Sequence, residues 1–380
     1  MMVMSKLPSV NTSIFSVMSA MASKYEAINL AQGFPNFESD CKLNELVTKA
    51  MRDKHNQYAP MPGLLSLREK ISEKIEKEHR VSYNPKTEIT ITAGATQAIF
   101  TAIAATINKG DEVIIFTPAY DCYEPTITLF GGKTIAYQLE APYYKPNWGE
   151  VKNLLTQKTK MLIINTPHNP SGTLFTKEDM LALQEIVVAH NLLVISDEVY
   201  EHIIFDGHIH QSAARFSALK NRTFITASFG KTFHVTGWKL GYCVAPEVLM
   251  QEFRKVHQYN VFCVNHPMQV AISNYLEDSD KYMALPKFYE NKRDTFLSLM
   301  KDSKFAIIPS QGTYFQLLGF AEITDESDIA FAERLTKNYG LATIPTSVFN
   351  NKQKDFKQLR VCFAKTDETL REAAAILQSI

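Results

Sequence analysis

A lysine in a stretch of small and polar residues is the strongest chemical feature of this sequence. Lys231 lies in the segment Ser-Phe-Gly-Lys-Thr, shortly after the apolar run 223–226. A lysine at the end of a buried strand is expected to be partly buried, and burial lowers the pKa of an ammonium group because water no longer solvates its charge. A neutral amine can attack a carbonyl carbon and form a Schiff base. Taken alone, however, Lys231 is better explained as a surface lysine in a loop.

Polar segments after other apolar runs change that interpretation. Asp197 and Tyr200 directly follow the run 192–196, which places a carboxylate and a phenol at the end of a predicted strand. Asn169 lies in a polar turn, and residues 94–96 join a strand to a helix N-terminus, where free N–H groups and the helix dipole favour a phosphate. Each feature is weak by itself because such residues are common in turns and helix caps. Together they indicate one site.

The elements that must position these groups alternate along the middle of the chain. The predicted strands are 88–92, 112–116, 161–164, 192–195 and 223–226, with a helix predicted at 97–107. Their continuous apolar character is typical of strands covered on both faces, as in a mostly parallel sheet with crossover helices. The polar segments follow the carboxyl ends of the strands, where open α/β sheets bind ligands. We therefore predict an α/β fold with the site at this edge.

The two flanks differ from the middle of the chain. Residues 1–35 show no alternation of strands and helices, whereas a long helical pattern at 281–301 leads into β-like runs and helices. We therefore expect a large domain over residues 36–277. Residues 1–35 and 278–380 are expected to form an N-terminal arm and a discontinuous smaller α+β domain.

Composition excludes several classes of protein. The 380 residues carry 40 Lys+Arg against 40 Asp+Glu, and this balance argues against a nucleic-acid or membrane-surface partner, which calls for a basic face. No apolar run approaches the ~18 residues of a membrane span, and the N-terminal segment is short and polar for a signal peptide. The five cysteines are scattered without a C-x-x-C pair, so neither a disulfide framework nor a metal site is indicated. A cytoplasmic globular protein is expected.

The polar segments, in this order, resemble the fold-type I, class I aminotransferases, which use pyridoxal phosphate. The resemblance rests on Asn169-Pro-Ser-Gly172, Ser196-Asp-Glu-Val-Tyr200, Ser228-Phe-Gly-Lys231 and Thr236-Gly-Trp-Lys-Leu-Gly241, and extends to 29–35, 56–63 and 359–363. It covers nearly the whole chain and is strongest to bacterial methionine aminotransferases, followed by the kynurenine aminotransferase/glutamine transaminase group. It implies a large domain with a mostly parallel seven-stranded sheet between helices, plus a smaller α+β domain.

The resemblance also implies roles around the cofactor ring. Lys231 would form an aldimine with pyridoxal phosphate and then move the proton at the substrate Cα. Asp197 would face the pyridine nitrogen, and Tyr200 and Asn169 would hydrogen-bond the phenolic oxygen. Tyr120 would stack on the ring.

Further matched residues would hold the cofactor phosphate. The backbone at Ala95 and Thr96, the Ser228 side chain and the Lys239 ammonium would bind it within one chain. Tyr58 matches a residue that crosses from the partner subunit to the phosphate. The resemblance therefore implies a homodimer with active sites at the interface.

On the substrate side, Arg360 would bind the α-carboxylate by a planar two-point contact, next to Gly33 and Asn169. No arginine matches the second one that aspartate-specific relatives use for the side chain. The candidate walls of the side-chain pocket are apolar or aromatic: Ile14, Phe15, Tyr259 and Phe262. Such a pocket favours methionine and aromatic or other neutral amino acids over dicarboxylic ones.

These inferences predict a ping-pong transfer of the α-amino group from methionine to a 2-oxo acid. Two alternatives would use the same cofactor: a cysteine-S-conjugate β-lyase and a kynurenine–oxoglutarate aminotransferase. A ligand-sensing transcription regulator would need a basic DNA-binding domain ahead of the aminotransferase pattern. This alternative is disfavoured, because the pattern begins near residue 30 and leaves no room for such a domain. A dinucleotide-binding protein is disfavoured because no G-x-G-x-x-G follows the first strand.

Overall fold

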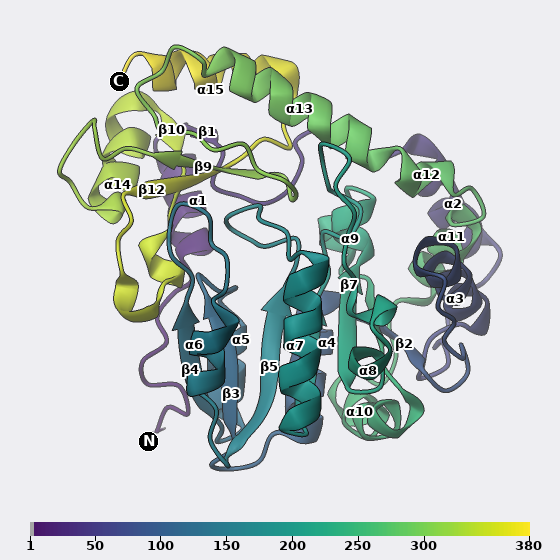
Figure 1. The fold of residues 1–380 in the computed structure, drawn as a ribbon. Coiled ribbons are helices and arrows are strands. Elements are labelled where there is room, and N and C mark those ends of the chain that lie inside the picture. Colours follow the sequence, from purple (N-terminus) through teal and green to yellow (C-terminus); the bar gives the residue numbers. More distant parts are fainter. Residues whose placement is uncertain (1–3) are drawn as a thin grey trace.

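The computed structural model describes residues 4–380, and a seven-stranded sheet forms the centre of the fold (Figure 1). The strand order is β2-β8-β7-β6-β5-β3-β4, and all neighbours pair parallel except β8, which runs antiparallel to β2 and β7. The strands are β2 (Ile89–Thr92), β3 (Glu112–Thr117), β4 (Lys133–Gln138), β5 (Thr159–Asn165), β6 (Leu193–Asp197), β7 (Thr223–Ser228) and β8 (Gly241–Val244). The predicted mostly parallel α/β sheet is confirmed.

Helices cover both faces of this sheet because its strands are apolar on both sides. In β3, Val113 and Ile115 pack in one hydrophobic cluster, while the intervening Ile114 and Phe116 pack in the other. Buried residues of α4 (Gly94–Thr106) and α10 (Glu247–Asn260) belong to the first cluster. Those of α7 (Lys177–Ala189) belong to the second.

Shorter elements complete this part of the chain. They are α5 (Tyr123–Leu129), α6 (Trp148–Asn153), α8 (Ser217–Lys220), α9 (Phe229–Thr232) and the 3₁₀ turn Thr236–Trp238. Three helices pack together at one side of the sheet: α2 (Cys41–Arg52), α3 (Leu65–His79) and α11 (His266–Tyr275). Figure 1 shows this group beyond the β2 edge.

The last hundred residues form a second layer over the carboxyl end of the large sheet (Figure 1). Its small antiparallel sheet has the order β11-β12-β9, with β9 (Phe315–Gly319), β11 (Ile344–Pro345) and β12 (Gln358–Cys362). Its helices are α12 (Asp280–Met283), α13 (Leu285–Leu299), α14 (Asp328–Tyr339) and α15 (Asp367–Gln378). The N-terminal region joins this layer, because β1 (Ile28–Asn29) pairs parallel with β10 (Leu341–Ala342).

Several elements differ from the sequence-based prediction. The region 1–35 contains the helix α1 (Ile14–Lys24) and the strand β1, although no regular alternation was visible there; residues 1–3 lie outside the described residues. The helix predicted at 281–301 is divided into α12 and α13, since Pro286 lacks an N–H group and starts a new helix. Strands β4 and β8 were not predicted, because polar residues occupy both ends of β4 and β8 directly follows the polar segment 236–240.

Two further features bear on the class of protein. The cysteines of residues 4–380 are all free thiols. Within the same residues, no helix has the length and apolar character that crossing a membrane requires.

Candidate active site

A cavity of about 330 Å³ opens where β5, β6 and β7 end and the second layer begins. It brings together all but one of the residues predicted to bind the cofactor or the substrate α-carboxylate. These lining residues are Gly33, Ala95, Thr96, Tyr120, Asn169, Asp197, Tyr200, Ser228, Lys231, Lys239 and Arg360. Tyr58 is the exception, since it does not line the cavity of its own chain and its side chain is 82% exposed.

Lys231 lies in the short helix α9, directly after β7, and extends into the cavity. Its Nζ donates a hydrogen bond to Gly33 O at 3.1 Å and lies over the ring of Tyr314. Burial lowers the pKa of this amine to about 8, and the nearby Arg360 and Lys239 charges act in the same direction. A substantial part of Lys231 is therefore uncharged at slightly basic pH.

Asp197 is the last residue of β6 and is 4% exposed. Burial raises the pKa of its carboxyl to about 6. The carboxylate accepts hydrogen bonds from Tyr123 Oη at 2.6 Å and from Val199 N at 3.3 Å, and both oppose that rise. A buried carboxylate at the wall of the cavity can bind a protonated ring nitrogen.

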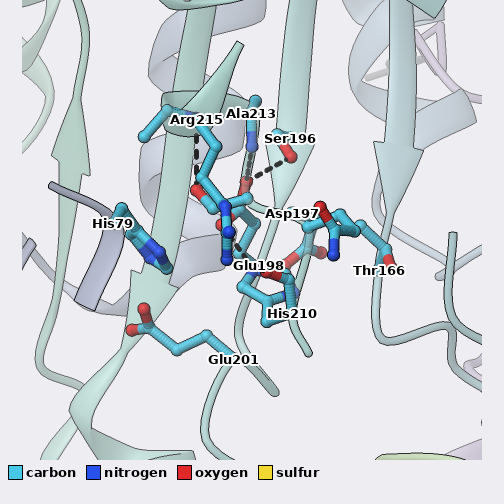
Figure 2. Close-up of polar contacts among 12 residues, drawn as sticks. His79, Thr166, Ser196, Asp197, Glu198, Glu201, His210, Ala213 and Arg215 are labelled. Carbon is cyan, nitrogen blue, oxygen red and sulfur yellow. Dashed lines mark hydrogen bonds and ion pairs between the residues drawn. The ribbon is translucent and has the colours of Figure 1, made fainter. Parts of the chain in front are cut away.

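Glu198 points into a separate buried network and holds the end of β6 from outside the cavity (Figure 2). Its Oε1 accepts hydrogen bonds from Ser196 Oγ at 2.7 Å and Ala213 N at 3.0 Å. Its Oε2 lies 2.7 Å from His210 Nε2. The segment that carries Asp197 and Tyr200 is thereby fixed to the loop before α8.

The neighbouring side chains of Glu78, His79 and Glu201 offer ligand atoms within 4.8 Å of one another, as a metal site would (Figure 2 shows His79 and Glu201). Lys74 Nζ, however, lies 2.7 Å from Glu201 Oε1. An ammonium group in this position repels a cation and already neutralises the carboxylate. We therefore interpret the cluster as an ion-pair network.

The N-terminus of α4 forms a cradle for an anion. No side chain caps this helix, so its first N–H groups are free to bind a ligand. Gly94 has φ +77°, and Lys239 Nζ lies 3.6 Å from where a Cβ at Gly94 would be. Ser228, the last residue of β7, lines the same end of the cavity. Free N–H groups, a hydroxyl and an ammonium together suit a phosphate.

Arg360 offers a binding site for a carboxylate. The side chain is 1% exposed, and its Nη atoms donate to the neutral oxygens Asn169 Oδ1 at 2.9 Å and Ala31 O at 2.8 Å. Its Nε has no hydrogen-bond partner within the part of the chain that the structure describes. The guanidinium also lies 3.9 Å from the centre of the Phe315 ring. A buried guanidinium without an acidic partner is stabilised by an incoming carboxylate.

Gly33 lies next to Lys231, and a residue with a side chain would clash with Phe315 at this position. A Cβ at this position would come within 2.8 Å of Phe315 Cζ. The Gly33 carbonyl accepts a hydrogen bond from Tyr314 Oη at 2.6 Å, in addition to the one from Lys231. The backbone of this segment can thus lie close to a bound substrate.

Some functional neighbours were not predicted from the sequence. Tyr123, Tyr314 and Phe315 contact Asp197, Gly33 and Arg360 respectively. Tyr123 follows the predicted ring-stacking residue Tyr120 by three positions, about one helical turn, which is a signal that could have identified it. Tyr314 and Phe315 lie far from the motifs in sequence. Strand pairing alone brings them to the site, since Phe315 is the register partner of Cys362.

The candidate side-chain pocket is only partly formed by the expected residues. Phe15 lines the cavity and packs against Phe349 with ring centroids 5.6 Å apart. Ile14, Tyr259 and Phe262 do not line it, and Tyr259 is 87% exposed. Tyr259 and Phe262, at and just after the end of α10, are exposed and do not enter the cavity of their own chain.

The cavity fits pyridoxal phosphate at each of its polar ends. The α4 N-terminus suits the phosphate, the buried Asp197 carboxylate suits the ring nitrogen, and the Lys231 amine suits the aldehyde. Arg360 remains available for the carboxylate of a substrate. The fold and the cavity thus define an α/β enzyme that binds pyridoxal phosphate and an amino acid.

Comparison with known proteins identifies the family. The family model for aminotransferase class I and II matches residues 25–377. The chain belongs to this family and is a pyridoxal-phosphate-dependent aminotransferase, as the sequence motifs predicted.

Individual relatives cover the chain almost completely. It is 44% identical to a methionine aminotransferase of Escherichia coli over 99% of this chain and 98% of that protein. A crystal structure of a methionine aminotransferase from Escherichia coli superposes with a TM-score of 0.98 at 43% identity, covering 100% of both chains. A kynurenine–oxoglutarate transaminase of Dictyostelium discoideum is 34% identical over 95% of this chain and 92% of that protein.

Proposed function

We propose that this aminotransferase takes the α-amino group of methionine, and of aromatic or other neutral amino acids, and transfers it to a 2-oxo acid by a ping-pong mechanism. The observation that carries the proposal is the set of cations in the cavity. These are Lys231, Lys239 and Arg360, and all three are needed for the cofactor or the α-carboxylate. Within residues 4–380, no other lining cation of this chain remains for a second carboxylate, so burying a dicarboxylic side chain in this cavity would be costly. The identity to the methionine aminotransferase of Escherichia coli supports methionine as the donor.

The residues around the ring would control its charge. Pyridoxal phosphate, when bound, supplies an electron-accepting ring that stabilises negative charge at the substrate Cα. Asp197 would keep the ring nitrogen protonated, while Tyr200 and Asn169 would donate hydrogen bonds to the phenolic oxygen. Tyr120 would pack against the face of the ring.

Lys231 would act as the proton carrier. In its neutral form, Nζ would take the proton from the substrate Cα. As an ammonium, it would deliver that proton to the carbon that was the cofactor's aldehyde carbon. A pKa of about 8 suits both directions, because neither form is strongly favoured near that pH. Arg360 would orient the substrate by its carboxylate, so that the Cα proton faces Lys231.

The phosphate would be held by the backbone of Ala95 and Thr96, the Ser228 hydroxyl and the Lys239 ammonium. Tyr58 of a second copy would complete this site, which makes the working enzyme a homodimer. The exposure of Tyr58 supports this assembly, since its ring lies 5.4 Å from the Phe262 ring in an exposed aromatic pair. We further propose the cytoplasm as its location, a large domain over 36–277, and a smaller one from 1–35 and 278–380.

A half-reaction screen tests the proposed donor. The cofactor-loaded enzyme is mixed with each amino acid separately, and the absorbance change of the bound cofactor is timed. Methionine and aromatic amino acids are expected to react about 10²-fold faster than aspartate or glutamate, because the cavity has no spare cation. A faster reaction with a dicarboxylic amino acid would overturn the proposal.

Kynurenine is the second candidate donor because of the 34% identity to a kynurenine–oxoglutarate transaminase. The same screen decides between methionine and kynurenine as the donor, by the ratio of the kcat/KM values for these two substrates. Release of pyruvate and ammonia from a cysteine conjugate, faster than amino transfer from methionine, would instead identify a β-lyase.

A further inference from the structure

A buried tyrosine outside the cavity lies in direct contact with Asp197. Tyr123 begins α5 and is 2% exposed, and its hydroxyl donates a hydrogen bond of 2.6 Å to Asp197 Oδ2. The side chain does not line the cavity, so it reaches the acid from behind. Burial keeps the Tyr123 phenol protonated, because it raises the pKa of that group well above its usual value. The hydroxyl therefore remains a hydrogen-bond donor near neutral pH.

The Asp197 carboxylate has few other groups that favour its ionised form. The Val199 N–H contact is longer, at 3.3 Å, and the adjacent Glu198 charge opposes ionisation. Lys231 favours ionisation more weakly than the Tyr123 hydrogen bond does. The remaining titratable side chains that interact with Asp197 are Tyr120, Cys122 and Tyr200, and all of them are neutral in the usual pH range.

The same turn of chain holds the residue expected to pack on the cofactor ring. Tyr123 N donates to Tyr120 O at 3.2 Å, and the two aromatic rings lie 6.0 Å apart in an edge-to-face arrangement. The start of α5 thus fixes two groups relative to each other: the ring of Tyr120 and the carboxylate of Asp197. A shift of this turn would move both.

We propose that Tyr123 is a positioning residue, whose hydroxyl orients the Asp197 carboxylate toward the cofactor nitrogen and keeps it ionised. This inference rests on the proposed role of Asp197. Without the hydroxyl, the buried carboxylate would lose its shortest donor and would protonate at a higher pH. A protonated acid cannot hold a pyridinium, so cofactor affinity would fall at a higher pH than in the unaltered protein.

The test measures cofactor affinity of the apoprotein between pH 5 and 9 by fluorescence quenching with pyridoxal phosphate. Tyr123→Phe should move the pH at which affinity is half lost upward by about one unit, which raises Kd about tenfold at pH 5 and about twofold at pH 7. Tyr83→Phe is the matched control, since Tyr83 is also 2% exposed but its hydroxyl has no hydrogen-bond partner within residues 4–380. Affinity in this control should remain unchanged at every pH.

A double-mutant cycle separates positioning from packing. In an Asp197→Asn background, Tyr123→Phe should have little further effect, because its action passes through the ionised carboxylate. Equal effects in both backgrounds, or an unshifted pH dependence in Tyr123→Phe, would overturn the inference. If the unaltered apoprotein does not bind pyridoxal phosphate, the assigned cofactor site fails instead, so the two failures are distinguishable.

Discussion

Arg360 and Lys231 place two basic side chains in one cavity, and burial affects them differently. A guanidinium stays protonated even when its pKa is lowered, as it is at Arg360. Lys231 starts from a lower pKa and reaches about 8, so its proton is exchangeable. A permanent cation suits a substrate carboxylate, whereas an exchangeable one suits proton transfer.

Arg360→Ala is predicted to raise KM for every amino acid by similar factors, about 10²-fold, because the α-carboxylate is common to all of them and loses a charge-assisted pair. Steady-state kinetics with methionine, phenylalanine and leucine measures this effect. Arg334→Ala is the control, since Arg334 is partly exposed and pairs with Glu326. An effect of Arg360→Ala on one substrate only would contradict the carboxylate role.

Lys231→Met is predicted to raise the free energy of unfolding of the apoprotein. This gain is expected to shrink as the pH rises from 8 to 10.5. The folded pKa of Lys231, about 8, lies below its ordinary value of 10.5, so the unfolded chain binds more protons in this window. Stability of the unaltered protein therefore rises with pH there, while the methionine variant lacks this contribution. Denaturant midpoints of both proteins across this range measure the difference. A difference that is constant with pH would contradict the lowered pKa.

At the scale of elements, the start of α4 shows how local sequence becomes a binding site. The apolar pattern predicted a helix from residue 97, but the helix begins at Gly94. The first free N–H groups thus belong to Gly94, Ala95 and Thr96, next to Lys239. Gly94 is required here because its φ of +77° is rarely adopted by residues with a Cβ.

Gly94→Ala is predicted to weaken pyridoxal phosphate binding about tenfold, since a Cβ at φ +77° strains the turn and shifts the first N–H groups of α4. Titration of the apoprotein with the cofactor measures the change in Kd. Gly110→Ala is a matched control: Gly110 has φ +92°, and nothing lies within 4 Å of its Cβ position. The control should lose stability but keep its cofactor affinity. Equal losses of affinity in the two variants would contradict the cradle at α4.

At the scale of the whole molecule, the exposed aromatic side chains bear on the proposed homodimer. Tyr58 and Tyr259 are 82% and 87% exposed, and Tyr58 packs edge-to-face against the Phe262 ring. Both lie apart from the cavity of their own chain. A homodimer would bury them and would bring Tyr58 to the second copy's phosphate cradle.

Hybrid dimers test this arrangement. Neither Lys231→Ala nor Tyr58→Ala homodimers should be active at normal levels, but a hybrid of the two would contain one unaltered site if Tyr58 acts across the interface. Random mixing of the two variants is then expected to restore about a quarter of the unaltered activity. No recovery, with hybrid formation verified by native mass spectrometry, would contradict a shared site.

The groups of the site were largely predictable because they occur in short motifs after apolar strands. Lys231, Asp197 and Asn169 each follow a run that is continuous enough to identify as a buried strand. Tyr314 and Phe315 were not predictable, since antiparallel pairing between β9 and β12 brings them to the site from a distant part of the sequence. The N-terminal helix α1 was also missed, and its Phe15 reaches the cavity through the same layer.

The amino-acid sequence by itself determined five of the strands of the large sheet and the chemical groups at the strand ends, because apolar periodicity and motif spacing are local properties. Only the tertiary structure decided how charged those groups are and which neighbours they have. The lowered pKa of Lys231 and the raised pKa of Asp197 arise from burial and from contacts between distant segments, as does the Arg360 Nε that has no hydrogen-bond partner among residues 4–380. Such effects depend on the burial of an atom and on the groups that surround it in three dimensions, and the order of residues along the chain does not specify these.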